Sequence, residues 1–324
     1  MKVMLKIISL CLILSILMAA ASAAKTSEVT VTVKEGYINL PAGKIWYRIA
    51  GADKEGIPLV VLHGGPAFPH DYLASLEAIS DERPVVFYDQ LGCGNSDRPS
   101  DMSLYSVEYF VDELEQICSS LDLKKIHILG QGWGNMLAVD YMLARKPDNV
   151  VSLIFASPCL SSSRFIEDQK VYLAELPEDL QKIIKESEGA GNFTSPEYQK
   201  AMNTYYKLHV CRIDPWPDCV NKSFEKIGQP LYEYMWGPSE FTVTGILKDY
   251  ERAERLKEIT VPTLFTCGRY DEVPPSSAEY YQSMMPVAEI AVFEDSSHHH
   301  HLEKNEEYIK VLRDFLRRIE TGKK

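Results

Sequence analysis

Apolar residues along the chain follow two alternating patterns, short continuous runs and longer stretches with a helical repeat. The continuous runs predict buried strands at residues 59–62, 85–88, 126–129, 150–156, 261–265 and 289–293, and two opening strands are expected at 29–33 and 45–50. Helical spacing predicts helices over residues 107–121 and 135–145, from residue 277, and around 308–316. This alternation is typical of a mostly parallel sheet covered by helices on both faces, so the predicted fold class is α/β.

The alternation stops between Leu160 and Arg255. This stretch has helical spacing, is rich in tyrosine and charged residues, and contains no clear buried strand. A core strand resumes at Val261. We interpret residues 160–255 as a helical cap inserted between two strands of the sheet.

The N-terminus has the pattern of a secretory signal. Lys2 and Lys6 are followed by an apolar run over 7–18 and by the small residues Ala21-Ser22-Ala23. Because a membrane-spanning helix needs roughly 20 apolar residues, a cleaved signal is favoured over a stable membrane anchor. The sequence therefore predicts a secreted or periplasmic protein. Its expected organisation is a signal peptide at 1–23, a first core segment at 24–159, the cap at 160–255 and a second core segment at 256–324.

The formal charge of −12 results from 34 Lys and Arg against 46 Asp and Glu. Such a surface repels nucleic acid and suits a cationic ligand. The chain has seven cysteines without a C-x-x-C spacing, so they do not indicate a zinc site. Cys211 and Cys219 are the nearest pair and could form a disulfide in an exported protein.

The segment Gly130-Gln131-Gly132-Trp133-Gly134 lies between a predicted strand and a predicted helix. It has the spacing of G-x-S-x-G, the nucleophile elbow, in which the N–H after the central residue points into the oxyanion hole. The centre here is Gly132, which has no nucleophilic atom. A plain tight turn and, less favoured by the spacing, a dinucleotide-binding loop are the alternatives.

Two further signals surround this turn. His63-Gly64-Gly65-Pro66 follows a buried strand, as does the loop that supplies a second oxyanion N–H in hydrolases with such elbows. Asp271 and His298 each follow a later strand. The chain order of elbow, acid and histidine is that of the hydrolase triad, in which the acid holds one ring nitrogen of the histidine. Each residue taken alone could equally be an ordinary loop residue.

His298 opens a run of four histidines that could suggest a metal site. Adjacent residues on a strand point to opposite faces, so only alternate members could share an ion. No ligand pattern of carboxylates or cysteines accompanies the run. We therefore expect neither a metal nor a cofactor.

At these motifs the sequence resembles the proline iminopeptidase family of α/β-hydrolases, particularly its tricorn-interacting aminopeptidase branch. The resemblance covers nearly all of the chain after residue 23. It rests on six segments: His63-Gly64-Gly65-Pro66, Asp89-Gln90-Leu91-Gly92-Cys93-Gly94-Asn95-Ser96-Asp97, the elbow, Trp236-Gly237-Pro238-Ser239-Glu240-Phe241, Gly268-Arg269-Tyr270-Asp271-Glu272 and Ser296-Ser297-His298.

The resemblance implies an α/β-hydrolase fold and an enzyme that releases N-terminal proline from short peptides with a free N-terminus. Asp271 and His298 match the family's acid and base, and Gly64, Gly65 and Trp133 match its oxyanion loop and hole. Glu240 and Glu272 match the glutamates that hold the substrate's amino group; without the family they would pass for solvated carboxylates.

The sequence departs from the family at Gly132, where the family has serine. Removing the nucleophile of a serine hydrolase costs about 10⁶ in kcat, so the resemblance implies a peptide-binding pocket with lost or strongly reduced activity. Three functions stay open: an inactive homologue that binds peptides, a hydrolase that uses His298 as general base on water, and a binding protein for another ligand.

Overall fold

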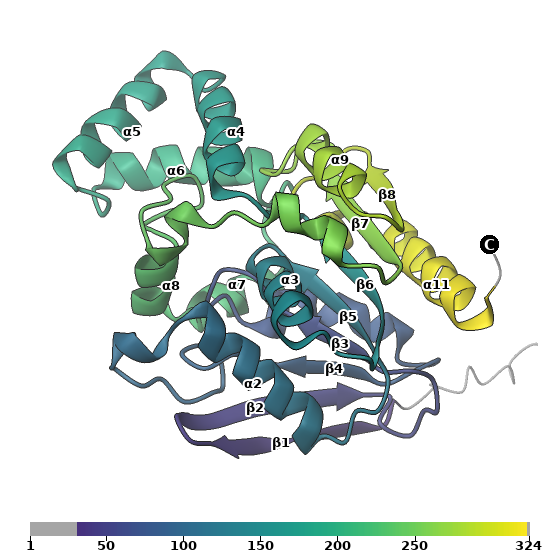
Figure 1. The fold of residues 1–324 in the computed structure, drawn as a ribbon. Helices are drawn as coiled ribbons and strands as arrows, with labels where there is room; N and C mark the ends of the chain where they lie inside the picture. Colours follow the sequence, from purple (N-terminus) through teal and green to yellow (C-terminus); the bar gives the residue numbers. More distant parts are fainter. Residues whose placement is uncertain (1–30, 323–324) are drawn as a thin grey trace, which may run out of the picture. The chain divides into compact units, whose positions relative to one another are not determined.

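The structure of the protein is a computed structural model that describes residues 31–322. Its sheet has eight strands in the order β1-β2-β4-β3-β5-β6-β7-β8 (Figure 1). Their bounds are Val33–Leu40 (β1), Gly43–Ala50 (β2), Leu59–Leu62 (β3), Val85–Tyr88 (β4), Ile126–Gln131 (β5), Val150–Ala156 (β6), Thr263–Gly268 (β7) and Ala288–Phe293 (β8). The strands from β4 to β8 are mutually parallel, while β2 runs antiparallel to both β1 and β4. The predicted α/β class is confirmed.

Both faces of the central strands β3, β4 and β5 are buried, which explains their continuous apolar runs. Along β3, Leu59 and Val61 belong to one hydrophobic cluster and Val60 and Leu62 to another. Successive side chains of a strand point to opposite faces, so each cluster fills one face. Helices α2 (Val107–Ser120), α3 (Trp133–Arg145) and α9 (Pro275–Ser283) contribute to the cluster of Val60 and Leu62. The 3-10 segment η1 (His70–Ile79) and α11 (Asn305–Thr321) contribute to the cluster of Leu59 and Val61.

The opening strand differs from its prediction at 29–33. Residues 29 and 30 lie outside the described range, and β1 begins at Val33 and ends at Leu40. Its residues alternate between exposed and partly buried, and it pairs only with β2 at the edge of the sheet. An edge strand needs only one apolar face, so β1 lacks the continuous run that marks the central strands.

Five helices lie between β6 and β7. They are α4 (Ser162–Ala174), α5 (Glu178–Ala190), α6 (Pro196–His209), α7 (Asp218–Glu225) and α8 (Gln229–Met235). In Figure 1, α4, α5 and α6 stand clear of the helices that cover the sheet. They share a hydrophobic cluster of their own, whose buried members include Leu180, Tyr198 and Tyr205. Two short 3-10 segments, η3 (Ile246–Asp249) and η4 (Ala253–Glu258), lie between α8 and β7. A third, η2 (Met102–Leu104), lies between β4 and α2. A last short helix, α10 (His300–Glu303), precedes α11.

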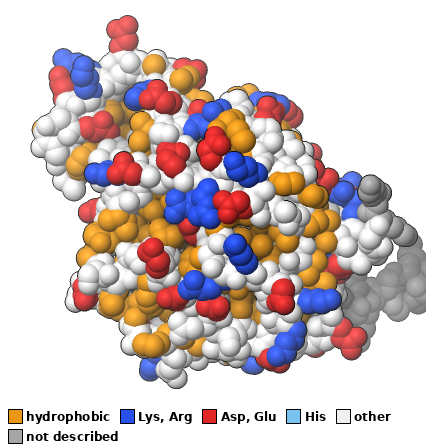
Figure 2. Space-filling model, in the orientation of Figure 1, with side chains coloured by type: hydrophobic (Ala, Val, Ile, Leu, Met, Phe, Trp, Pro, Cys, Tyr) orange, Lys and Arg blue, Asp and Glu red, His pale blue; other side chains and the backbone are white. Residues whose placement is uncertain are grey.

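The surface carries charges of both signs. On the face shown in Figure 2, Lys and Arg side chains lie among Asp and Glu side chains rather than in a patch of one sign. Of the helices within residues 31–322, none has the length and apolar character needed to cross a membrane. The predicted signal peptide at 1–23 lies outside the described residues.

Candidate active site

The turn from β5 into α3 has the backbone of a nucleophile elbow. Gly132 caps α3 with φ 53° and ψ −118°, a left-handed conformation that favours glycine over residues with a Cβ. Gly134 lets the helix approach the sheet, because a Cβ there would lie 2.1 Å from the Leu62 carbonyl oxygen. A Cβ built on Gly132 would lie 3.4 Å from His298 Nε2, an ordinary contact distance. The side chain of any residue at position 132 would therefore face the imidazole of His298.

Asp271 follows β7 and is fully buried. Its Oδ1 lies 3.0 Å from His298 Nδ1 and accepts the Val273 N–H at 3.0 Å. Its Oδ2 accepts a hydrogen bond of 2.6 Å from the Ser157 hydroxyl and one of 3.3 Å from the Gly268 N–H. Burial by itself would raise the pKa of Asp271, but the neighbouring His298 and these donors hold it below its usual value. The carboxylate is thus fixed and charged beside His298.

His298 lies between Asp271 and a second carboxylate. Its Nδ1 is 3.4 Å from Glu272 Oε1, in addition to its contact with Asp271. Burial lowers the pKa of His298, but the charges of Glu272, Asp271 and Glu240 outweigh it and raise the pKa to about 9. At neutral pH the ring is therefore an imidazolium, whose Nε2 faces Gly132.

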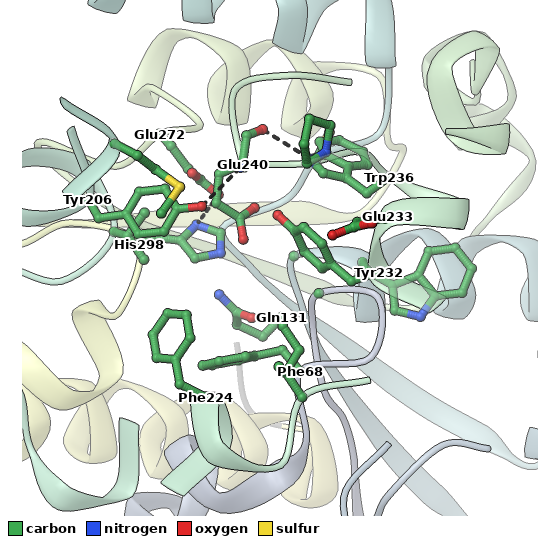
Figure 3. A pocket seen from close by; sticks show the side chains of 18 of the residues that line it. Phe68, Gln131, Tyr206, Phe224, Tyr232, Glu233, Trp236, Glu240, Glu272 and His298 are labelled. Atoms are coloured by element: carbon green, nitrogen blue, oxygen red, sulfur yellow. Dashed lines mark hydrogen bonds and ion pairs between the residues drawn. The ribbon is translucent and has the colours of Figure 1, made fainter. Parts of the chain in front are cut away.

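Glu240 and Glu272 approach the cavity from different elements. Glu272 is buried directly after Asp271, and its Oε2 has no hydrogen-bond partner among residues 31–322. Glu240 is partly buried in the loop after α8, where its N–H donates to the Tyr206 hydroxyl at 3.2 Å and its carbonyl accepts the Trp236 indole N–H at 3.0 Å. Figure 3 shows both carboxylates beside His298. Burial raises the pKa of each, and their mutual repulsion raises that of Glu272 further.

The loop after β3 only partly matches the predicted arrangement of oxyanion donors. The Gly64 N–H donates to the Tyr72 hydroxyl at 2.8 Å, so it is already engaged. Gly65 and Trp133 both line the cavity, and neither N–H meets an acceptor within the described part of the chain. As the first residue of α3, Trp133 has no intrahelical acceptor for its N–H. Two of the three predicted donors are thus available at the cavity.

The site opens into a cavity of about 450 Å³ between the sheet and the helices inserted after β6. Its lining includes Gly132, His298, Glu240 and Glu272 together with aromatic side chains. The aromatic members are Phe68, Trp133, Phe165, Tyr206, Phe224, Tyr232 and Trp236. This combination of an apolar wall and a few converging polar groups is typical of a small-molecule site (Figure 3).

The remaining histidines of the run are not arranged as on a strand. His299 precedes α10 and His300 is its first residue, so the expected alternation of faces is wrong. His300 contacts Ser157 and Thr266, while His301 contacts the Tyr72 carbonyl. Burial lowers the pKa of His300 to about 4 and that of His301 to about 3. Within the described residues, no group of three or more His, Cys, Asp or Glu could hold a metal ion.

The disulfide that Cys211 and Cys219 could have formed is not present in the structure. Both are free thiols, like the other four cysteines within the described residues. Cys211 is buried after α6 and Cys219 is partly buried in α7.

Sequence reasoning missed two residues that shape the site, Ser157 and Tyr72. Ser157 follows β6 with φ 50° and bridges Asp271 to the His298 carbonyl, which it reaches at 3.0 Å. Tyr72 links Gly64 to Gln131: its hydroxyl accepts a hydrogen bond from the Gly64 N–H and donates one to Gln131 Oε1. Ser157 carried one usable signal, its place at the carboxyl end of a core strand. Tyr72 lies in η1, far from every motif in sequence, and carried none.

Comparison with known proteins agrees with this geometry. The family profile of the α/β hydrolase fold matches residues 57–305. A proline iminopeptidase of Heyndrickxia coagulans is 44% identical over 286 residues, which cover 88% of this chain and 99% of the relative. The chain belongs to the proline iminopeptidase family of α/β hydrolases. A family member from Saccharolobus solfataricus is 36% identical, with 90% of this chain and 94% of the relative covered.

Solved structures extend the comparison. The crystal structure of a Mycobacterium smegmatis proline iminopeptidase matches with a TM-score of 0.82 and 32% identity, covering 90% of this chain and all of the other. The crystal structure of VinJ matches with a TM-score of 0.85 and 34% identity, covering 88% of this chain and 99% of the other. The resemblance to proline iminopeptidases inferred from the motifs is therefore confirmed at the level of the family.

The predicted secreted or periplasmic location is wrong. Two of the proline iminopeptidases that match this chain align over 94–99% of their own length, and this family membership does not support export. Two lysines, an apolar run and the small residues at 21–23 have the pattern of an export signal, but this local pattern was the only support for that location. The family comparison outweighs it.

Proposed function

We propose that the protein is a proline iminopeptidase-type hydrolase whose pocket receives the free amino end of a short peptide, and that Gly132 strongly reduces its peptide hydrolysis. The observation that carries the proposal is the 3.4 Å between His298 Nε2 and a Cβ built on Gly132. At this distance a serine hydroxyl at position 132 would be within reach of the imidazole that Asp271 holds. Further placement in the tricorn-interacting branch rests on the motifs around Glu240 and Glu272.

Glu240 and Glu272 are the proposed partners of the peptide's ammonium group. Two carboxylates that are buried or partly buried bind a cation strongly, because water screens them little. The absence of a hydrogen-bond partner for Glu272 Oε2 among the described residues supports this role. A peptide with a blocked amino end leaves both carboxylates uncompensated and is expected to bind poorly.

Catalysis with serine at position 132 would use the residues already in place. The serine oxygen would attack the carbonyl carbon and pass its proton to His298 Nε2, while Asp271 stabilises the imidazolium. The N–H groups of Gly65 and Trp133 are the proposed oxyanion donors, and Gly64 is a positioning residue through Tyr72. We also propose that residues 160–255 act as the cap over this site, between core segments 24–159 and 256–324.

A second candidate function is hydrolysis by water without a covalent intermediate, with His298 as general base. The position of His298 Nε2 beside Gly132 favours it. Its raised pKa of about 9 opposes it at neutral pH, since an imidazolium cannot accept a proton. Such activity would therefore increase towards pH 9.

The proposal is tested by turnover of L-proline p-nitroanilide. The natural chain is expected to show little turnover, and Gly132→Ser is expected to raise kcat by about 10⁴ or more, because the covalent step is restored. N-acetyl-L-proline p-nitroanilide is the matched control and should not be turned over, since it offers no ammonium. A folded Gly132→Ser protein that shows no gain, or that cleaves both substrates equally, would contradict the proposal.

A further inference from the structure

The Gly132 turn is surrounded by hydrogen-bond donors and contributes no side-chain acceptor of its own. Trp133 presents the free N–H at the start of α3, a helix of 13 residues, and Gly65 presents its N–H from the loop after β3. Helix N-termini attract anions, because their unpaired N–H groups and the helix dipole both favour negative charge. A helix end alone does not define a ligand, so the groups facing it decide.

Gln131 provides an independent indication of an acceptor at this position. It is only 2% exposed, lines the cavity, and its Nε2 has no hydrogen-bond partner among the described residues. In Figure 3 the amide nitrogen points towards His298. A buried amide N–H without an acceptor is costly, which indicates that a bound group supplies the acceptor.

The orientation of the Gln131 amide is fixed by its neighbours. The Tyr72 hydroxyl accepts the Gly64 N–H and therefore has its own hydrogen left to donate to Gln131 Oε1. Gln131 Oε1 lies so close to Gly64 that a side chain there has no room, because a Cβ would lie 2.4 Å from this oxygen. Because Oε1 must receive this hydrogen, Nε2 is the atom left without a partner among the described residues.

His298 completes the donor set with a charge. Its Nε2 faces Gly132, while its Nδ1 is held by Asp271 at 3.0 Å and lies 3.4 Å from Glu272 Oε1. One imidazole ring thus separates a group of donors at Gly132 from a group of acceptors at Glu272 and Glu240. An α-amino acid also presents a negative and a positive group close together, because a single carbon joins its carboxylate to its ammonium.

We propose that the pocket binds a free apolar α-amino or imino acid as its zwitterion. Its carboxylate would be held at Gly132 by the N–H groups of Trp133 and Gly65, the Gln131 amide and the His298 imidazolium. Its ammonium would be held by Glu240 and Glu272. The inference rests on the amine site of the proposed function and adds a second, anionic recognition site to it.

Glycine at position 132 favours this ligand over the peptide. A serine there would place an oxygen with two lone pairs, and the volume of its side chain, where the ligand carboxylate would lie. It would also take the His298 Nε2 proton as its hydrogen-bond partner. With glycine, the same donors remain free for an oxygen that carries a full negative charge, and charge-assisted hydrogen bonds are roughly twice as strong as neutral ones.

Isothermal titration calorimetry near neutral pH with L-proline, L-prolinamide and N-acetyl-L-proline tests the inference. The three probes share a ring and differ in the charged groups they present. The natural chain is expected to bind L-proline at least tenfold more tightly than L-prolinamide, and N-acetyl-L-proline most weakly. Gly132→Ser is expected to remove the advantage of L-proline over L-prolinamide.

The decisive variant is Gln131→Glu, which keeps the acceptor for Tyr72 and replaces the amide nitrogen by oxygen. This variant should bind L-proline at least tenfold more weakly than the natural chain does, and should bind L-prolinamide no more weakly. Gln116→Glu is the matched control, since Gln116 lies in α2 and not in the cavity lining, with its amide donating to the Asp112 carbonyl, and this change should leave the binding of both ligands unaltered. Thermal unfolding shows whether each variant is folded. If Gln131→Glu is unfolded, the result for Gly132→Ser alone decides whether the inference holds.

The failures of the two proposals can be distinguished. Binding of L-prolinamide as tightly as L-proline would overturn the zwitterion inference and leave the amine site of the proposed function intact. Binding of neither compound to the natural chain would overturn both, because the ammonium recognition that they share would be missing.

Discussion

At the scale of single residues, Gly132 has the backbone conformation expected of a nucleophile elbow but no side chain that could act as a nucleophile. Its φ of 53° is a conformation that a residue with a Cβ holds only at a cost of about 1–3 kcal/mol, which proteins tolerate where chemistry requires it. Glycine removes that strain and leaves His298 facing the donors of the turn. Gly132, His298, Glu240 and Glu272 line one cavity, and Asp271 holds the ring of His298 from behind it.

The raised pKa of His298 leads to a prediction for the Gly132→Ser protein. His298 must be neutral to accept the serine proton, so kcat/KM should increase with pH up to about 9, the pKa of His298 in the free protein. p-Nitrophenyl acetate is the suitable substrate, because it has no ionisable group of its own.

The same assay locates the cause of the shift. The charge of Glu272 is one of the causes that raise the pKa of His298, so adding Glu272→Gln should move the rise in kcat/KM to lower pH. Glu186→Gln, on the exposed side of α5, is the control and should leave the profile in place. A rise centred at the same pH in all three proteins would contradict this account of the electrostatics.

Residues near the chemistry were only partly predictable from the sequence. Asp271 and His298 could be located because the chain order and the strand ends identify them. Gln131 and Tyr72 could not, since their roles depend on a hydrogen bond between residues 59 positions apart. Gly64 was expected to donate to an oxyanion, but its N–H goes to Tyr72 for the same reason.

At the scale of elements, the central strands were predictable because both of their faces are buried. β3, β4 and β6 have the predicted bounds, whereas β1 was misplaced because only one of its faces packs against the core. The segment η1 and the short helix α10 were not predicted at all. η1 is a 3-10 segment, and the three consecutive histidines at 299–301 hide the helical repeat of α10.

The loop that carries Glu240 depends on α6 for its position. Replacing Tyr206 by Phe in the Gly132→Ser protein removes the acceptor of the Glu240 N–H, a bond of 3.2 Å. A hydrogen bond of this kind contributes about 1 kcal/mol, so KM for L-proline p-nitroanilide should rise about fivefold with little change in kcat.

Tyr234→Phe in α8 is the matched variant, because the Tyr234 hydroxyl has no hydrogen bond with any described residue and KM should not change. A fall in kcat with unchanged KM in the Tyr206 variant would show that Tyr206 acts on the chemical step and not on the glutamate loop.

At the scale of the whole molecule, buried histidines couple stability to pH. Burial is the main cause that lowers the pKa from 6.5 to about 4 or about 3 in four of them, namely His63, His127, His300 and His301. Between these values and 6.5 the unfolded chain binds protons that the folded chain does not. The free energy of unfolding should therefore fall as the pH is lowered from about 6.5 towards 4.

Glu113 opposes this trend and offers a control. Burial raises its pKa to about 8, so the folded chain keeps a proton that the unfolded chain loses above pH 4.5. Glu113→Gln should consequently make the loss of stability on acidification steeper. Urea unfolding at a series of pH values measures both effects, and a flat profile between pH 6.5 and 4 in the natural chain would be inconsistent with neutral buried histidines.

The assignment of the whole molecule depends on Gly132 occupying the nucleophile position opposite His298. Labelling with a fluorophosphonate, read by intact mass, tests this without relying on any peptide substrate, because the reagent reacts with an activated serine. The natural chain should gain no adduct, Gly132→Ser should gain one, and Gly132→Ser combined with His298→Ala should again gain none. An unlabelled but folded Gly132→Ser protein, or labelling that persists without His298, would contradict the account.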